Sequence, residues 1–275
     1  MNIDELQNKA VDIRKQLVQM IYEAGGGHIG GSLSSVDILV ALHYGVMKLD
    51  PKNPKWEQRD RFILSKGHSV EGYYALLCDM GFFSQDELKS YRKFGSKLIG
   101  HPSNKVPGVE ASTGALGHGL SMGVGMAIAG KMDAKDYKVY VLMGDGEQAE
   151  GSLWEAAMAA ANYKLDNLVG IVDRNGLQIS GSTENVMKLE SLSGKWSSFG
   201  WHVQVVDGHD IAGLISAFQN IPVEKDKPHL IIANTVKGKG VPFMENEPAW
   251  HHKVPDSQQL SMALQALDAQ YKEVK

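Results

Sequence analysis

The sequence predicts a single α/β domain, in which a parallel β-sheet is covered by helices on both faces. Two apolar runs, residues 139–143 and 168–172, have the length of buried strands, and the alanine-rich segment 152–163 between them is typical of a helix. Strand, helix and strand in this order form a βαβ unit, whose two strands are parallel. Continuous apolar strands are typical of a sheet that is buried on both faces.

The other segments fit the same architecture. Apolar residues recur at helical spacing in residues 4–23, and this predicted helix ends at the glycines 25–27. A second helix is predicted to begin at Ser34 or Ser35, which are good N-cap residues. Further helices are predicted at residues 73–80, 119–132 and 257–272, and further strands at residues 62–64, 203–206 and 230–235. No repeat or low-complexity linker divides the chain, so we expect residues 1–275 to form one domain.

Composition excludes several functional classes. A chain of 275 residues, 43% of them hydrophobic, is long enough for one large closed core. The formal net charge of -4 gives no basic surface for a nucleic-acid partner. We expect no membrane span and no signal peptide, because no run of about 18 apolar residues occurs and the N-terminal segment is polar and periodic. Cys78 is the single cysteine, which excludes an internal disulfide, and we expect a cytoplasmic protein.

The most informative stretch begins with a Gly-Asp-Gly tripeptide, residues 144–146, directly after the predicted strand 139–143. Asn175 follows the strand 168–172 in a similar way. Because ligands of parallel sheets bind outside the carboxyl ends of strands, Asp145 and Asn175 are expected to face one crevice. A carboxylate and an amide oxygen suit Mg²⁺ or Ca²⁺, and Mg²⁺ commonly completes its shell with phosphate oxygens. The pattern predicts a divalent cation that bridges to a phosphorylated ligand.

A simple turn is the alternative explanation of the same residues. A Gly-Asp-Gly tripeptide after a strand is often only a turn, and Asn175-Gly176 is a common turn pair. Two neighbouring features favour a binding site. Gly146 lets the backbone approach a ligand closely, and the helix predicted from Ser152 directs its N-terminus to the same region, which favours an anion.

The whole string GDGEQAEGSLWEAAMAAANYKLDNLVGIVDRNGL, residues 144–177, resembles the thiamine-diphosphate motif, which opens with Gly-Asp-Gly and closes with Asn. The resemblance implies that Asp145 and Asn175 bind Mg²⁺, or Ca²⁺ or Mn²⁺ in its place. The backbone carbonyl of Leu177 would be a third ligand, and Gly146 would contact the diphosphate of the cofactor.

Four histidines lie in contexts similar to those of the active-site histidines of transketolases, in the same chain order: His28 in GGGHIGGSLSS, His68 in SKGHS, His101 in GHPS and His251 in AWHHK. The resemblance implies that His28 and His251 face the donor C3 hydroxyl and the acceptor carbonyl. His101 would hold the donor C1 hydroxyl, and His68 would lie between the diphosphate and the sugar. Imidazole suits this chemistry, because cleaving the C2–C3 bond of a ketose requires a base that takes and returns a hydroxyl proton. A lone histidine is more often structural, but four in matching contexts predict an active site.

The turn STGALGHG, residues 112–119, resembles the loop that passes the diphosphate and aminopyrimidine of the cofactor, which implies contacts at Gly114 and Leu116. His68 and His251 are expected to touch the cofactor as well. The likeness covers residues 10–255, and its departures leave the sugar specificity open. The family pattern would have Pro, Pro, Gln and Gly where this chain has Ile29, Ala115, His118 and His252.

Two glutamates and a lysine near these motifs have open roles. Glu150 and Glu155 lie at the start of a predicted helix, where negative charge is favourable in any protein. The resemblance implies that both belong to an acidic network between two active sites, and we expect Glu150 to contact the cofactor and take part in catalysis. The role of Glu155 stays open. Lys237 belongs either to the diphosphate site or to a solvated loop.

The chain has the length of only the first of the three domains of full-length transketolases. In the family, the second domain supplies the glutamate that protonates the aminopyrimidine and the pocket for the pyrimidine ring. We therefore expect an N-terminal subunit of a split transketolase, which is active only with a C-terminal subunit that carries the pyrimidine-binding domain. Two copies of each chain would assemble, with the small-residue helix at 119–132 against a partner. The expected reaction moves a two-carbon ketol unit from a ketose phosphate to an aldose phosphate.

Three alternatives compete with this prediction. A deoxyxylulose-phosphate synthase, or a transketolase for a sulfonated or branched sugar, would share the metal motif; the histidine contexts favour transketolase but do not choose between sugars. A chain that only binds cofactor is disfavoured because Asp145, Asn175 and the histidines are all present. A zinc enzyme is disfavoured because no His-x-x-x-His pair or cysteine cluster occurs among the 10 histidines and one cysteine.

Overall fold

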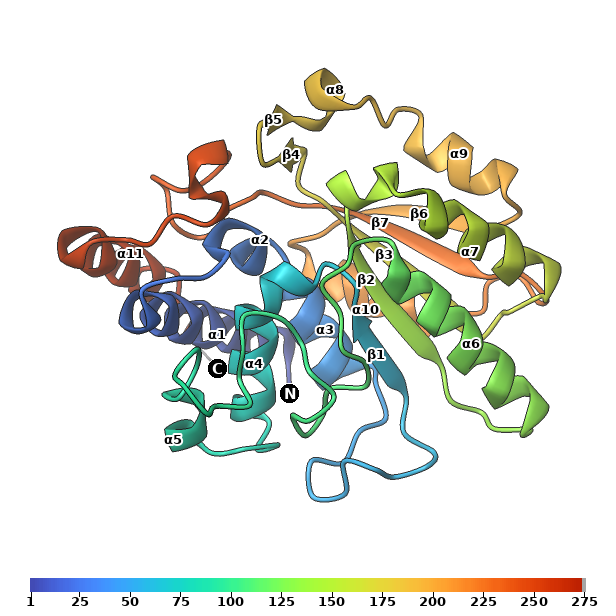
Figure 1. Cartoon of the computed structure of the whole chain (residues 1–275), viewed down its shortest axis with the longest axis horizontal. Coiled ribbons are helices and arrows are strands. Elements are labelled where there is room, and N and C mark those ends of the chain that lie inside the picture. The colour runs from blue at the N-terminus through green and yellow to red at the C-terminus, as the bar shows by residue number, and fades with distance from the viewer. Residues whose placement is uncertain (274–275) are drawn as a thin grey trace.

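A computed structural model of the chain describes residues 1–273, and its centre is a five-stranded sheet (Figure 1). Every pair of neighbouring strands in this sheet is parallel. In spatial order the strands are β1 (Arg61–Leu64), β2 (Val139–Gly144), β3 (Leu168–Arg174), β7 (His229–Asn234) and β6 (His202–Asp207). The predicted strands are confirmed. Because β2 and β3 are neighbours, Gly144 pairs with Asp173, and the segments that follow both strands emerge side by side.

Helices cover both faces of the sheet, which confirms the predicted fold class (Figure 1). The first face packs against α1 (Ile3–Ala24), α3 (Val36–Gly45), α4 (Val70–Asp79) and α10 (Ile211–Gln219), and α11 (Ser257–Asp268) lies against α1. The second face packs against α6 (His118–Met132), α7 (Gly151–Asn162) and α9 (Leu192–Ser198). None of the described helices is long and apolar enough to cross a membrane.

Alternation along each strand divides the apolar residues between two cores. Val141 and Leu142 are both fully buried, yet Val141 belongs to the core under α6 and α7 and Leu142 to the core under α1 and α3. Successive side chains of a strand point to opposite faces, so a continuous apolar run fills both cores at once. Gly123 of α6 lets that helix lie close to the sheet, because a Cβ there would be 2.6 Å from the Cγ2 of Val141.

The turn after α1 differs in one respect from the sequence prediction. The helix ends at Gly25, whose φ of 61° is left-handed, as expected for a C-terminal glycine. An additional short helix, α2 (Ile29–Ser34), then precedes α3. Ser35 is the N-cap of α3, but its hydroxyl donates to the carbonyl of Gly31 at 3.0 Å rather than capping the helix. The preceding turn of α2 provides this carbonyl and takes the hydroxyl away from the capping position.

The segment after β3 folds over the carboxyl edge of the sheet (Figure 1). Its elements are the hairpin of β4 (Leu177–Gln178) and β5 (Gly181–Ser182) and the short helix α8 (Thr183–Val186). Short 3-10 turns and one further short helix complete the described chain: η1 (Gly67–Ser69), α5 (Gln85–Leu88), η2 (Gly146–Ala149) and η3 (Pro248–His251).

Gln148 connects the turn η2 to the tryptophans of the second core. Its backbone carbonyl accepts from the indole N–H of Trp154, and its Oε1 accepts from that of Trp196, both at 3.0 Å. Its Nε2 donates to the carbonyl of Gly144 at 2.9 Å. Trp196 is fully buried, and its packing also anchors the turn that follows β2.

Candidate functional site

A cavity of about 430 Å³ opens where β2 and β3 end. It is the crevice expected at the carboxyl edge of a parallel sheet. Predicted site residues from six separate segments line it, namely His28, His68, Gly114, Leu116, Asp145, Gly146, Asn175, Leu177 and His251. His101 lies next to this wall rather than in it, and Glu150 lies outside the cavity on the exposed surface.

The four predicted histidines form one cluster with His28 at its centre. The ring centroid of His28 lies 5.3 Å from that of His68, 5.5 Å from that of His251 and 6.3 Å from that of His101. His101 also packs against the turn at residues 112–119, because a Cβ on Gly114 would be 2.9 Å from the Cδ2 of His101. His252 adds a fifth ring to the cluster, 6.0 Å from that of His28. Four segments that are far apart in sequence therefore converge on one point.

Burial keeps His28, His68 and His251 neutral at pH 7. It is the largest cause that lowers the pKa of His28 to about 4 and the pKa of His251 to about 3. Positive neighbours, including Lys237 beside both rings, add to the effect. The pKa of His68 is also well below its usual value, for the same reasons. A neutral imidazole has a free nitrogen lone pair, so each ring can accept a proton.

Asp145 lines the same cavity, in a part that we call the carboxylate wall with Asn175, and is 2% exposed. Its Oδ1 accepts from the backbone N–H of Gly146 at 2.8 Å, and its Oδ2 accepts from that of Gly176 at 2.7 Å. Burial raises the pKa of Asp145, and the nearby carboxylate of Asp173 raises it further. The guanidinium of Arg174, which the sequence analysis did not single out, also donates to Oδ2 at 3.2 Å.

Asn175 has its amide oriented by residues on either side of it. The Nδ2 donates to Asp173 at 3.4 Å, and Oδ1 accepts from the backbone N–H of Leu177 at 3.1 Å. Within residues 1–273, no three His, Cys, Asp or Glu side chains are grouped to hold a metal ion. A cation at this wall would therefore draw on amide, backbone and ligand oxygens beside Asp145, which is the manner in which Mg²⁺ usually binds with phosphates.

Two buried lysines stand between the histidines and the carboxylates. Lys66, which the sequence analysis missed although it lies two residues before His68, forms a buried ion pair with Asp173. Lys237 is 2% exposed, and its Nζ donates to the Nδ1 of His251 at 2.9 Å. In the described part of the chain, Lys237 has no carboxylate at ion-pair distance. Burial and the charge of Lys66 lower the pKa of Lys237 to about 8. Lys237 thus belongs to the site and not to a solvated loop.

Glu147 is a third residue that the sequence analysis did not single out. It is 2% exposed, and it accepts from the backbone N–H groups of Gly117 at 2.8 Å and Gly144 at 3.0 Å and from the hydroxyl of Ser65. Burial raises the pKa of this carboxyl. Glu150 is instead the N-cap of α7, without a side-chain capping bond. Its predicted contact with a cofactor stays a prediction.

The donor set of the cavity fits a diphosphate with a divalent cation. A carboxylate and an amide suit the cation, and two buried ammonium groups suit an anion. Gly31 of α2 lines the cavity and packs closely against the turn η1, because a Cβ there would be 2.7 Å from the Oγ of Ser69. Any residue larger than glycine at position 31 would therefore clash with Ser69.

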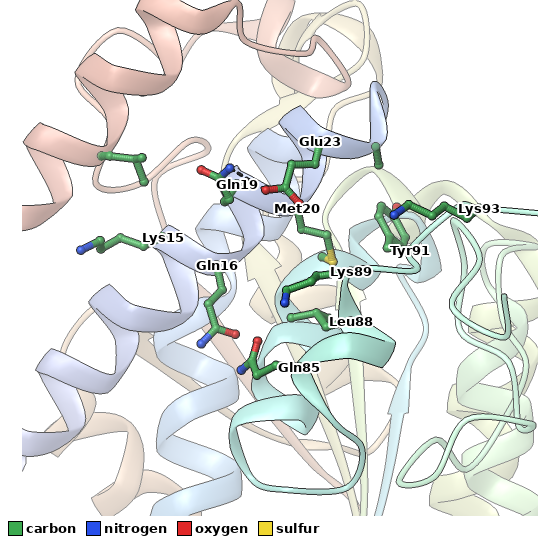
Figure 2. A pocket seen from close by; sticks show the side chains of 12 residues that line it. Lys15, Gln16, Gln19, Met20, Glu23, Gln85, Leu88, Lys89, Tyr91 and Lys93 are labelled. Carbon is green, nitrogen blue, oxygen red and sulfur yellow. Dashed lines mark hydrogen bonds between the residues drawn. The ribbon is translucent and has the colours of Figure 1, made fainter.

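A second pocket, of about 390 Å³, has a different chemistry. Figure 2 shows its lining, which comes from α1, from the segment around α5 and, at Leu264, from α11, and which is rich in lysine and glutamine. None of the clustered histidines reaches it. One of its wall residues, Tyr91, is nevertheless linked to the histidine cluster, because its hydroxyl and the backbone N–H of His28 donate to the same oxygen of Glu71.

Comparisons with known proteins identify the family of the chain. Residues 6–270 match the family model described as transketolase, thiamine diphosphate binding domain. The chain is 52% identical to an apulose-4-phosphate transketolase subunit of Phocaeicola vulgatus, over 96% of this chain and 94% of the relative. It is 43% identical to a 6-deoxy-6-sulfo-D-fructose transketolase subunit of Clostridium sp. (strain MSTE9), over 90% of each.

Single-chain transketolases are matched over part of their length. The chain is 39% identical to human transketolase over 91% of this chain, and it spans 40% of that relative. The crystal structure of the Campylobacter jejuni transketolase superimposes with a TM-score of 0.91 at 34% identity, over 98% of this chain and 43% of that one. Because the family model matches residues 6–270, which is nearly the whole of this chain, the chain belongs to the transketolase family, as a thiamine diphosphate-binding domain of that family.

Proposed function

We propose that this chain is the diphosphate-binding, N-terminal subunit of a two-chain transketolase that works in the cytoplasm. The cavity at the ends of β2 and β3 carries the proposal, because it joins a histidine cluster to the Asp145 and Asn175 wall. A relative named as a transketolase subunit is matched over 94% of its length, whereas human transketolase is matched over 40%. The partner would supply the pyrimidine-binding domain, and two copies of each chain would form the assembly.

The proposed ligands are thiamine diphosphate and Mg²⁺, or Ca²⁺ or Mn²⁺ in its place. Asp145, Asn175 and the backbone carbonyl of Leu177 would hold the cation. When bound, thiamine diphosphate supplies the electron sink that carries a two-carbon ketol unit between sugars. The residues proposed to contact it are Gly114, Leu116, Gly146, His68, His251 and Glu150, the last of which lies outside the cavity lining.

The histidines would move the protons of the reaction. His28 is neutral at pH 7 and can take the proton of a sugar hydroxyl, and His101 would hold a second hydroxyl of the donor. Since Lys237 donates to the Nδ1 of His251, the proton of that neutral ring is on Nε2. His251 can therefore donate to the carbonyl oxygen of an acceptor aldose.

Relatives favour a specialised sugar as the substrate. Two relatives named as apulose-4-phosphate transketolase subunits are 52% and 46% identical to this chain, and the sulfofructose relative is 43% identical. We therefore propose a branched ketose phosphate of the apulose 4-phosphate type as the donor. Transketolase action on xylulose 5-phosphate is the second candidate, and a deoxyxylulose-phosphate synthase fits the histidine cluster less well.

Ketol transfer by the reconstituted enzyme tests the proposal. The chain would be assayed alone and with a candidate C-terminal subunit, with thiamine diphosphate and Mg²⁺. The donors would be apulose 4-phosphate, 6-deoxy-6-sulfofructose and xylulose 5-phosphate, with an aldose phosphate acceptor. We expect activity only in the mixture, and the largest kcat/KM with apulose 4-phosphate. Activity of the chain alone would refute the need for a partner, and inactivity of the mixture with all three donors would refute the proposed reaction.

A further inference from the structure

Glu71 is a buried carboxylate that the proposed reaction does not use. It lies in the first turn of α4 and is 0% exposed. Within residues 1–273, no lysine, arginine or histidine side chain lies at ion-pair distance from it. A buried carboxylate without a counter-charge is costly unless hydrogen-bond donors surround it. The hydrogen-bond donors around Glu71 therefore explain how its buried carboxylate is stabilised.

Three donors from three segments converge on this carboxylate. The backbone N–H of His28 donates to Oε1 at 2.9 Å, and the hydroxyl of Tyr91 donates to the same oxygen at 2.7 Å. The hydroxyl of Ser32 in α2 donates to Oε2 at 2.7 Å. Glu71 thus joins the turn after α1, the helix α2 and the segment after α5.

The contact with His28 leaves little freedom to the backbone. A Cβ on Gly27 would be 2.6 Å from the Oε1 of Glu71, so the carboxylate rests directly against this turn. The ring of His28 is at the centre of the histidine cluster. Because Glu71 binds the backbone N–H of His28, it holds the backbone from which this ring extends. Tyr91 stabilises the carboxylate from the other side, where it forms part of the wall of the pocket in Figure 2.

We propose that Glu71, supported by Tyr91, is the positioning residue of His28: its carboxylate binds the backbone of His28 and fixes where this imidazole lies in the cluster. The catalytic consequence rests on the proposed function, but the placement of the ring does not. Glu71 does not line the cavity, so it acts through His28 and not on a ligand.

Two variants and a matched control test the proposal. Glu71→Gln keeps the shape but replaces one acceptor oxygen by an N–H donor, and Tyr91→Phe removes one donor. Tyr73→Phe is the control, because Tyr73 lies in the same helix as Glu71 and also donates one 2.7 Å hydrogen bond, to the carbonyl of Gly108, away from the site. If Glu71→Gln fails to fold, Tyr91→Phe carries the test.

The first readout is the imidazole signal of His28 in an NMR titration of the chain alone, assigned with His28→Asn. We expect the pKa of His28 to rise from about 4 toward the ordinary value of a free imidazole in both test variants, because the ring is no longer held in its buried place. The Tyr73→Phe control should match the wild type. An unchanged His28 titration in folded Glu71→Gln would overturn the proposal.

The second readout separates this proposal from the proposed function. In the reconstituted two-chain enzyme we expect Glu71→Gln to lower kcat at least about 10-fold, since a misplaced catalytic group loses its near-attack geometry. The affinity for thiamine diphosphate should stay within about twofold, because Glu71 itself does not line the cavity. If the wild-type pair is inactive with every sugar but the His28 signal still moves, the proposed function fails and the positioning role stands.

Discussion

The two walls of the cavity respond to burial in opposite ways. The histidine wall is formed by His28, His68 and His251, and the carboxylate wall by Asp145 and Asn175. Burial lowers the pKa of His28 and His251, whereas it raises the pKa of Asp145. In both cases the environment disfavours the charged form. The rings of the histidine wall are therefore neutral at pH 7, and each has a free ring nitrogen that can bind a ligand hydroxyl. The carboxylate wall is suited to a divalent cation, whose charge stabilises the carboxylate of Asp145.

Removing the charge of the carboxylate wall gives the largest expected effect. Asp145→Asn keeps the shape but loses the anionic ligand, and we expect the affinity for thiamine diphosphate in the presence of Mg²⁺ to fall by at least about 100-fold. Isothermal titration calorimetry of the chain with thiamine diphosphate and Mg²⁺ measures this affinity. Asp86→Asn, on the surface next to Lys89, is the matched control and should bind as the wild type does. Equal affinity of Asp145→Asn and the control would mean that this wall holds no cation.

The lysine between the walls should give the second largest effect. Lys237 has a pKa of about 8, so it is positive below that pH and loses its charge above it. We expect the affinity for the anionic diphosphate to be constant from about pH 6 to 7.5 and to weaken about 10-fold by about pH 9.5, which is the loss of one charged hydrogen bond.

Lys237→Arg should abolish this decline, because a guanidinium stays charged throughout the range. Lys239→Arg, two residues away and outside the cavity, is the control and should keep the decline. The same titration calorimetry, repeated across the pH range, measures both variants. A decline that persists unchanged in Lys237→Arg would assign it to another group.

The histidine wall should produce the smallest effect, on stability. Because the pKa values of His28 and His251 are lowered in the folded chain, their contribution is present above pH 6.5 and is lost as pH falls toward 4. Urea unfolding at pH 7 and pH 5 should therefore show a smaller loss of stability in the double variant His28→Asn/His251→Asn than in the wild type. The difference should be about 1 kcal/mol after solvent screening of these half-buried rings is taken into account.

His118→Asn is the control for this comparison, because His118 lies on the exposed surface of α6. It should lose as much stability between the two pH values as the wild type. Parallel losses in all three proteins would show that the histidine wall does not contribute to the acid sensitivity of the fold.

The carboxylate wall was easier to predict from the sequence than the histidine wall. Asp145 and Asn175 directly follow buried strands, so local pattern and the geometry of parallel sheets suffice to bring them together. The histidines come from distant segments, and only their resemblance to a known family predicted that they would meet. What holds them could not be predicted, because Glu71 and Tyr91 are linked to His28 by tertiary contacts alone.

The choice between two acidic residues illustrates the same limit. Glu147 and Glu150 lie three residues apart in one motif, and the sequence analysis selected Glu150. In the fold, the 3-10 turn η2 brings the carboxylate of Glu147 back to the backbone N–H of Gly144, while Glu150 faces solvent. The turn buries Glu147 and exposes Glu150, and neither the composition of the motif nor the spacing of its residues indicates this. Arg174 was overlooked for a related reason, since its partner Asp145 belongs to the segment after the neighbouring strand.

The bonds of Gln148 to two indoles have a practical consequence. Gln148 lies three residues after Asp145, and its side chain binds Trp196 while its carbonyl binds Trp154. Tryptophan emission depends on the polarity and hydrogen bonding around the indole. A ligand that shifts the turn η2 would therefore alter the fluorescence of these rings, so the protein carries a built-in optical reporter next to its carboxylate wall.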